Sequence, residues 1–470
     1  MKKLLGFLLS VAILLGACFG VYYYLSSTDY MSTLAQSVRT LFEQALQSAQ
    51  PDAQDLAPEG PTGPGAGTPS PSTPSGPAYN GQEQVVDRDE ALDTLLYAAA
   101  LNFTEEVDIA HLGYTTDELE EEISRFFFFH PDLFYVDGKY SVYTAGEGGA
   151  VTKIKLNYLT TPAQAQTQLN YYNNVLDTVV GAIPAGASDF DKVLYLHDYL
   201  VKNYAYDYEG LAEETATGQS VAVRDAYTFF YGKVGVCQAY MLAMIALCEE
   251  AGIPCVPVVS EEMEHAWNLV KLDGAWYHVD VTWDDAGGEQ SAVYPSYVSY
   301  RYFLLSGPAL YNGGRQVTWQ TSEAASSTKY DTALWREATT QMCKNGTDYF
   351  CVVYDKTANA PKIWRGTPEE MTAVATLDAR WYSTYPSYYT QAWASIVVWE
   401  DLMLVNTADG FLHYNAATNT LSEAVDLSST LGTAKIFGVC EVEADGTVIF
   451  VVAEDYRGAF SLEEWQIPSI

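Results

Sequence analysis

A cysteine, a histidine and an aspartate occupy positions from which they could act together in nucleophilic catalysis. Cys237 follows Gly235 just before an apolar run, Ala239 to Leu247, which predicts a helix buried on all sides. The first turn of a helix offers unpaired backbone N–H groups and the positive end of the helix dipole, and both favour a thiolate. A lone cysteine in such a segment is usually structural, so Cys237 needs a neighbouring base to become a candidate nucleophile.

A predicted hairpin downstream supplies that base. Asp273-Gly274 is a strong signal for a two-residue turn between two strands, 265–272 and 275–280. Counting back from the turn puts His265 and Asp280 on one face of adjacent strands as diagonal neighbours, about 7–8 Å apart between backbones. An aspartate at that position accepts the imidazole N–H, fixes the tautomer and stabilises the imidazolium ion.

The other histidines are interpreted as structural. His278 shares the face of the candidate histidine but has no equally placed carboxylate in the predicted hairpin. His197 lies on the apolar face of a predicted amphipathic helix, where a histidine is usually a hydrogen-bonded residue at the core edge. We expect His111 and His130 to be surface or structural residues, and His413 to alternate outward on its strand.

Three segments resemble the core motifs of the transglutaminase-like superfamily. They are 235–240 (Gly-Val-Cys-Gln-Ala-Tyr), 265–268 (His-Ala-Trp-Asn) and 276–284 (Trp-Tyr-His-Val-Asp-Val-Thr-Trp-Asp), in the family's order. The flanking Ala226-Tyr227 and the segment 302–305 also resemble its bacterial cell-surface members.

This resemblance implies a papain-like α+β core with a catalytic triad. Cys237 would be the nucleophile, His265 the general base and acid, and Asp280 the residue that orients the histidine. The Cys237 backbone N–H would meet the oxyanion together with a second donor, for which Tyr227 and Gln238 are candidates. No Asp-rich calcium loop is evident, so the metal activation of animal members is not implied and no cofactor is expected.

Such a site attacks a carboxamide or peptide carbonyl and forms a thioester. Water as the acceptor gives a peptidase or amidase, whereas an amine gives a crosslinking transglutaminase, and the motifs do not separate the two. A catalytically inactive surface binding module is the third alternative. Hydrolysis of a protein or a cell-wall peptide is the reading we favour from the sequence.

Composition limits the partners. The 470 residues include 24 Lys and Arg against 60 Asp and Glu, a formal net charge of −36. Such a chain repels phosphate backbones, so we expect no nucleic acid partner. Because 48% of the residues are apolar and 14% are aromatic, the chain as a whole is not disordered.

The amino terminus predicts a membrane tether. Lys2 and Lys3 precede an uncharged run, Leu4 to Leu25, that is long enough as a helix to span a bilayer with the following residues outside. Residues 15–18 resemble a bacterial lipoprotein box, in which case Cys18 would carry lipid. Both alternatives place the rest of the chain on the extracytoplasmic face of the cell membrane.

We divide the chain into five parts. They are a signal anchor or lipoprotein signal (1–27), a Pro/Gly/Ser-rich spacer (28–84), an N-terminal α+β domain (85–184), a transglutaminase-like catalytic core (185–312) and an all-β repeat domain (319–470). Three apolar strands in the last part, 350–354, 402–405 and 448–452, are each followed by a shorter aromatic strand. This repeat is typical of propeller blades, although an open meander or a sandwich would fit it equally well.

Seven cysteines with irregular spacing do not form a disulfide framework. A predicted turn at Asn345-Gly346 would place Cys343 and Cys351 on opposite faces of paired strands, so we expect no bridge between them. The cysteines other than Cys18 and Cys237 are interpreted as small apolar residues.

Overall fold

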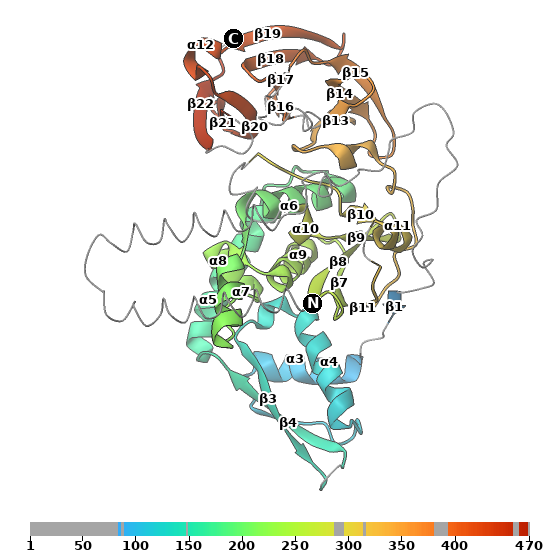
Figure 1. Ribbon diagram of the computed structural model, residues 1–470. Coiled ribbons are helices and arrows are strands. Elements are labelled where there is room, and N and C mark those ends of the chain that lie inside the picture. Colours follow the sequence, from blue (N-terminus) through green and yellow to red (C-terminus); the bar gives the residue numbers. More distant parts are fainter. Residues whose placement is uncertain are drawn as a thin grey trace, which may run out of the picture. The chain divides into compact units, whose positions relative to one another are not determined.

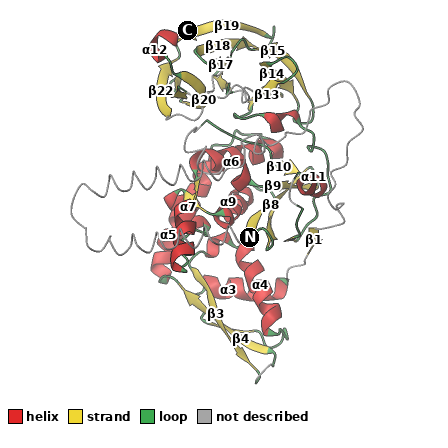
Figure 2. Cartoon of the chain, in the orientation of Figure 1, coloured by secondary structure: helices red, strands yellow, loops and turns green. Residues whose placement is uncertain are grey.

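The computed structural model describes residues 83–85, 89–146, 149–285, 296–313, 316–379, 393–454 and 460–468. The predicted anchor and almost all of the predicted spacer lie outside these residues. Residues 70–470 form one compact unit, in which helices and strands mix up to residue 321 and strands dominate after residue 343 (Figures 1 and 2). Within the described ranges, no helix is both long and apolar enough to cross a membrane. The five-part division stays a prediction.

The first described helices and strands form an α+β layer. A three-stranded sheet, in the order β2-β4-β3, packs with helices around a core that includes Leu92, Ile123 and Ile154. The helix α5 begins at Pro162 as predicted, because proline fits the first turn of a helix. The elements are α3 (Glu90–Leu101), β2 (Glu106–Asp108), α4 (Thr116–Phe129), the 3-10 helix η1 (Pro131–Leu133), β3 (Val136–Thr144), β4 (Val151–Tyr158) and α5 (Pro162–Gly181).

A six-stranded sheet in the order β1-β11-β7-β8-β9-β10 carries the hairpin predicted above. Its strands are β1 (Glu83–Val85), β7 (Cys255–Ser260), β8 (His265–Leu272), β9 (Ala275–Val279), β10 (Phe303–Leu305) and β11 (Trp319–Thr321). β1 pairs with β11 in parallel, whereas the other pairs are antiparallel. β1 includes Glu83 and Gln84, the last two residues of the predicted spacer.

The helix α9 lies at the centre of the helical layer. It contacts β7 and β8 of the sheet and the helices α5, α6 and α8, and every residue from Ala239 to Cys248 is buried. This position explains why the helix is apolar on all sides. The layer comprises α6 (Asp189–Asn203), β5 (Ala205–Tyr206), α7 (Tyr208–Thr217), α8 (Ala226–Gly232), β6 (Val234–Gly235), α9 (Cys237–Glu250) and α10 (Val281–Asp284). The helix α11 (Gly307–Asn312) packs instead in a separate core cluster with Trp267 and Trp319.

The three predicted β repeats correspond to three separate antiparallel sheets. Each sheet is a meander in which neighbouring strands follow one another in the chain. The sheets are β12 (Cys343–Asn345), β13 (Asp348–Asp355), β14 (Ala360–Gly366) and β15 (Met371–Thr376); β16 (Ile396–Trp399), β17 (Leu402–Asn406), β18 (Gly410–Asn415) and β19 (Thr420–Asp426); and β20 (Lys435–Val442), β21 (Thr447–Ala453) and β22 (Phe460–Gln466). The short helices η2 (Leu334–Glu337) and α12 (Ser428–Leu431) lie between strands.

The turn between β12 and β13 differs from the prediction. Asn345 pairs with Asp348, so the two turn residues are 346–347, one position later than expected. Gly346 takes the left-handed conformation, with φ +64°, which only glycine adopts without strain. Cys343 therefore pairs with Phe350, and both Cys343 and Cys351 are free thiols.

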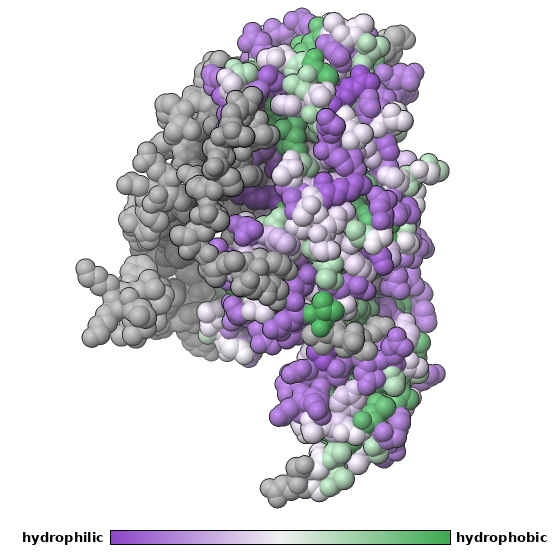
Figure 3. Space-filling model, turned by 90° about the vertical axis from the view of Figure 1, so that its right-hand side faces the viewer, coloured by the Kyte–Doolittle hydropathy of each residue, from purple (hydrophilic) through white to green (hydrophobic). Residues whose placement is uncertain are grey.

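Figure 3 shows one face of the molecule. This face is mainly hydrophilic, with apolar residues scattered in small groups. This is the pattern of a solvated surface.

Candidate active site

Cys237 is the first residue of α9. The N-cap residue, Val236, makes no side-chain hydrogen bond to the first turn, and Cys237 is only 9% exposed. The thiol therefore lies at the edge of the core, beside the N–H groups of the first helical turn, as the sequence predicted.

The hairpin has the predicted register. Leu272 pairs with Ala275, and both turn residues, 273–274, have positive φ angles, as this two-residue turn requires. The register brings His265, at the start of β8, beside Asp280, which directly follows β9.

His265 and Asp280 form a buried hydrogen bond. Nε2 of His265 lies 2.7 Å from Oδ2 of Asp280. The other carboxylate oxygen accepts the backbone N–H of Trp283 at 3.1 Å, so the short helix α10 fixes the orientation of the aspartate. Burial opposes protonation of the imidazole most strongly, but the charge and hydrogen bond of Asp280 outweigh it and raise the pKa of His265 to about 9.

The same imidazole also reaches the thiol. Burial disfavours the thiolate most strongly, yet the hydrogen bond and positive charge of His265, aided by the backbone N–H of Ala266, lower the pKa of Cys237 below its ordinary value. The carbonyl of Glu264 lies 4.0 Å from the sulfur. The three residues chosen from the sequence are therefore adjacent in the structure, and their catalytic roles are taken up below.

The two sequence candidates for the second oxyanion donor, Tyr227 and Gln238, lie in different surroundings. Tyr227 stacks on Phe134, with 4.6 Å between ring centroids, in the aromatic layer around α8. Gln238 is half-buried in the first turn of α9. Tyr206, which sequence reasoning did not select, lies close enough to Cys237 for the charge and backbone N–H of that residue to act on its hydroxyl.

His278 has a carboxylate neighbour that the sequence did not reveal. Its Nδ1 accepts the indole N–H of Trp267 at 3.0 Å, and its Nε2 lies 3.5 Å from Oε1 of Glu83 in β1. This carboxylate comes from β1, which joins the sheet from a distant part of the chain, and not from the hairpin.

His197 belongs to a buried polar network. Its two ring nitrogens lie 2.9 Å from Asp198 and 3.2 Å from Asp284. Burial opposes protonation, but these two carboxylates raise the pKa of His197 to about 9. This agrees with the structural interpretation; His130, likewise, lies 3.0 Å from Asp93, and His111 is exposed.

The two tryptophans beside His265, Trp267 and Trp283, differ in their exposure to solvent. Trp267 stacks on His265 at 5.5 Å, but it is only 1% exposed because Trp319 of β11 packs against it at 6.2 Å. Trp283 lies 5.8 Å from the His265 ring and is 46% exposed. Trp283, and not Trp267, therefore offers an aromatic surface to a substrate.

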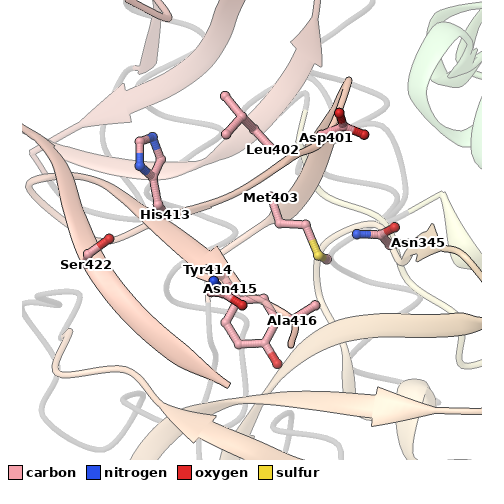
Figure 4. Close-up of a pocket in the computed structure, with 9 residues that line it drawn as sticks. All are labelled: Asn345, Asp401, Leu402, Met403, His413, Tyr414, Asn415, Ala416 and Ser422. Atoms are coloured by element: carbon pink, nitrogen blue, oxygen red, sulfur yellow. The ribbon is translucent and has the colours of Figure 1, made fainter. Parts of the chain in front are cut away.

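A separate depression of about 380 Å³ lies among the C-terminal strands. Its polar lining includes Asn345 of β12, His413 and Asn415 of β18, and Ser422 of β19 (Figure 4). The buried Nε2 of His413 has no hydrogen-bond partner among the described residues, so this histidine lines a cavity instead of simply facing outward. Neither here nor elsewhere in the described part of the chain could a cluster of three His, Cys, Asp or Glu residues hold a metal ion.

Comparison with known proteins gives the family of this region. Residues 178–281 match the model of the transglutaminase-like superfamily. Kyphoscoliosis peptidase from Mus musculus is 23% identical over 159 residues, which cover 31% of this chain and 23% of the mouse protein. The Homo sapiens protein of the same name is 28% identical over 89 residues, covering 16% of this chain and 14% of its own length.

The matches thus span about a quarter or less of these curated relatives. A crystal structure of a TGase aligns with 42% of this chain and 48% of its own, at 15% identity and a TM-score of 0.21. A TM-score this low does not establish a shared fold. The matched residues contain Cys237, His265 and Asp280, and the chain therefore carries an α+β core of the transglutaminase-like superfamily.

Proposed function

We propose that this chain is a thiol enzyme that cleaves peptide or carboxamide bonds through Cys237, His265 and Asp280. The observation that carries the proposal is the position of one imidazole, which reaches the Cys237 thiol on one side and holds a buried carboxylate at 2.7 Å on the other. A structural histidine needs no thiol beside it at the first turn of a helix.

The chemistry follows from these contacts. The Cys237 thiolate attacks the carbonyl carbon, the carbonyl electron pair moves to oxygen, and the Cys237 backbone N–H stabilises the oxyanion. Collapse of this intermediate forms a thioester and expels an amine, which takes its proton from the His265 imidazolium. His265 then deprotonates the acceptor that breaks the thioester, while Asp280 keeps the ring oriented.

Water is the acceptor that we favour. An amine must compete with water at about 55 M, which requires an apolar channel that shields the thioester. Among the described residues, Trp283 is the exposed aromatic side chain beside the imidazole, and one wall leaves the sulfur open to water. The name of the curated relatives, kyphoscoliosis peptidase, also favours a peptide substrate.

The acceptor can be tested with a library of glutamine-containing peptides and a labelled primary amine. Wild-type protein and Cys237→Ala are compared for new amino termini, free acid and incorporated label. New termini or free acid that depend on Cys237 support hydrolysis. Label incorporation without them indicates a crosslinking transglutaminase, and no product that depends on Cys237 indicates a binding module.

We also propose that the enzyme acts outside the cell membrane on a protein or cell-wall peptide. The basic start, the apolar run from Leu4 to Leu25 and the spacer favour this location. Protease treatment of intact cells tests it, because an extracytoplasmic domain is cleaved without lysis, whereas protection until lysis would place it inside.

A further inference from the structure

The strand β5 holds Tyr206 against the segment that leads into Cys237. Tyr206 pairs in parallel with Gly235 of β6. The residue on each side of Tyr206 donates a backbone hydrogen bond to the same segment, Ala205 to the carbonyl of Lys233 at 3.0 Å and Asp207 to that of Gly235 at 3.1 Å. The backbone of Tyr206 is therefore fixed beside Gly235, which lies two residues before the nucleophile Cys237 in the chain.

A second set of hydrogen bonds makes this arrangement rigid. The buried carboxylate of Asp207 accepts the backbone N–H of Val223 at 3.1 Å and that of Gly210 at 2.9 Å. Val223 in turn accepts the N–H of Val236, the N-cap of α9, at 2.9 Å. Asp207, the neighbour of Tyr206, and Val236, the N-cap of α9, thus both bond to Val223. These bonds fix their positions relative to each other.

The side chain of Tyr206 completes the geometry. Its hydroxyl lies near the Cys237 backbone N–H, which is the group expected to meet the oxyanion. Burial, followed by the nearby Cys237 charge, raises the pKa of Tyr206 to about 12, so the hydroxyl keeps its proton. A protonated hydroxyl can donate a hydrogen bond at the point where charge develops.

We infer that Tyr206 is the second oxyanion donor of this site. When a carbonyl oxygen accepts the Cys237 N–H, the nearby Tyr206 hydroxyl donates to the same oxygen. This inference rests on the proposed function, since it assigns a further catalytic residue to the same reaction. It replaces Tyr227, whose ring stacks on Phe134.

p-Nitrophenyl acetate provides a test that does not require the natural substrate. The Cys237 thiolate forms a C–S bond to the acetyl carbon while the carbonyl pair moves to oxygen. The oxyanion then re-forms the carbonyl and breaks the C–O bond, releasing p-nitrophenolate, and the proton from the thiol stays on His265. The first burst of p-nitrophenolate measures this acylation.

Tyr206→Phe removes only the hydroxyl. Loss of one oxyanion donor typically slows acyl transfer by about 10²-fold or more, so we expect the burst rate to fall by roughly that factor. Tyr208→Phe is the matched control, because its ring lies 4.9 Å from that of Tyr206 and should leave the burst unchanged. Alkylation by iodoacetamide, which forms no oxyanion, should proceed at a similar rate in the wild type and both variants.

Each other outcome overturns the inference in a distinct way. If Tyr206→Phe acylates as fast as the wild type, Tyr206 is not a donor, although the proposed function stands. If acylation and alkylation fall together in Tyr206→Phe, the tyrosine acts on the thiolate or on folding and not on the oxyanion. If wild-type Cys237 does not acylate at all, the proposed function fails, and this inference fails with it.

Discussion

The pKa of His265 provides the sharpest quantitative test of the candidate triad. The rise from the ordinary value of 6.5 to about 9 corresponds to roughly 3 kcal/mol in favour of the imidazolium. The charge and hydrogen bond of Asp280 lead the causes that raise it, and burial, the largest single cause, opposes them. Asp280→Asn removes the charge and leaves the burial, so we expect the pKa of His265 in this variant to fall to its ordinary value or below.

The loss of the imidazolium charge should also raise the pKa of the Cys237 thiol. At about pH 7.5 nearly every His265 ring is protonated in the wild type, whereas at most about a tenth would be in Asp280→Asn. Asp280 also repels the thiolate directly, but this is the smallest of the causes that act on Cys237, and the loss of the His265 charge outweighs it. The thiolate population near neutral pH should therefore fall together with the imidazolium population.

Thiolate absorbance near 240 nm, followed against pH, measures this change, and subtraction of the Cys237→Ala curve isolates one thiol. Asp273→Asn is the matched control, because Asp273 lies in the turn of the same hairpin with its side chain 75% exposed. Its titration should match that of the wild type. A curve for Asp280→Asn that also superimposes on the wild type would refute the reasoning.

Three further predictions follow from the fold. His197, with its pKa raised to about 9, should stabilise the protein fully below about pH 6.5 and lose that contribution as the pH rises through about 9; urea unfolding of His197→Gln should lack this part of the pH dependence. Gly235→Ala would bring a Cβ to 2.6 Å from Phe229 and 2.8 Å from Ala239, and we expect a loss of about 1–3 kcal/mol in the free energy of unfolding, whereas Gly181→Ala, with nothing within 4 Å, should cost nothing. Cleavage of the spacer between Pro51 and Asn80 should release a soluble fragment that keeps its activity, because β1 begins at Glu83; loss of activity on release would show that the membrane-proximal residues contribute to the site.

Local signals explain what the sequence could predict. The Asp273-Gly274 turn fixes the register of its hairpin by itself, and that register was sufficient to bring His265 and Asp280 together. The apolar run of α9 indicated a buried helix with Cys237 at its start. Both arguments use residues close together in the chain, so neither needed the tertiary structure.

Long-range pairings explain what was missed. Tyr206 reaches Cys237 through a two-residue parallel pairing of β5 with β6, which has no periodic signal. Glu83 reaches His278 because β1 pairs with β11. Trp267 is covered by Trp319 of the same distant strand, so its burial could not be predicted from the hairpin alone.

The most direct test of the central claim is the relative alkylation rate of the cysteines in the native protein. Burial raises the pKa of Cys440 to about 11 and that of Cys343 to about 12, whereas that of Cys237 is lowered. Alkylation requires a thiolate. At about pH 7, peptide mass spectrometry after brief iodoacetamide treatment should find the label on Cys237 far ahead of the other cysteines, and His265→Ala should slow that labelling. Equal labelling of all accessible cysteines, unchanged in His265→Ala, would contradict a thiolate nucleophile at Cys237.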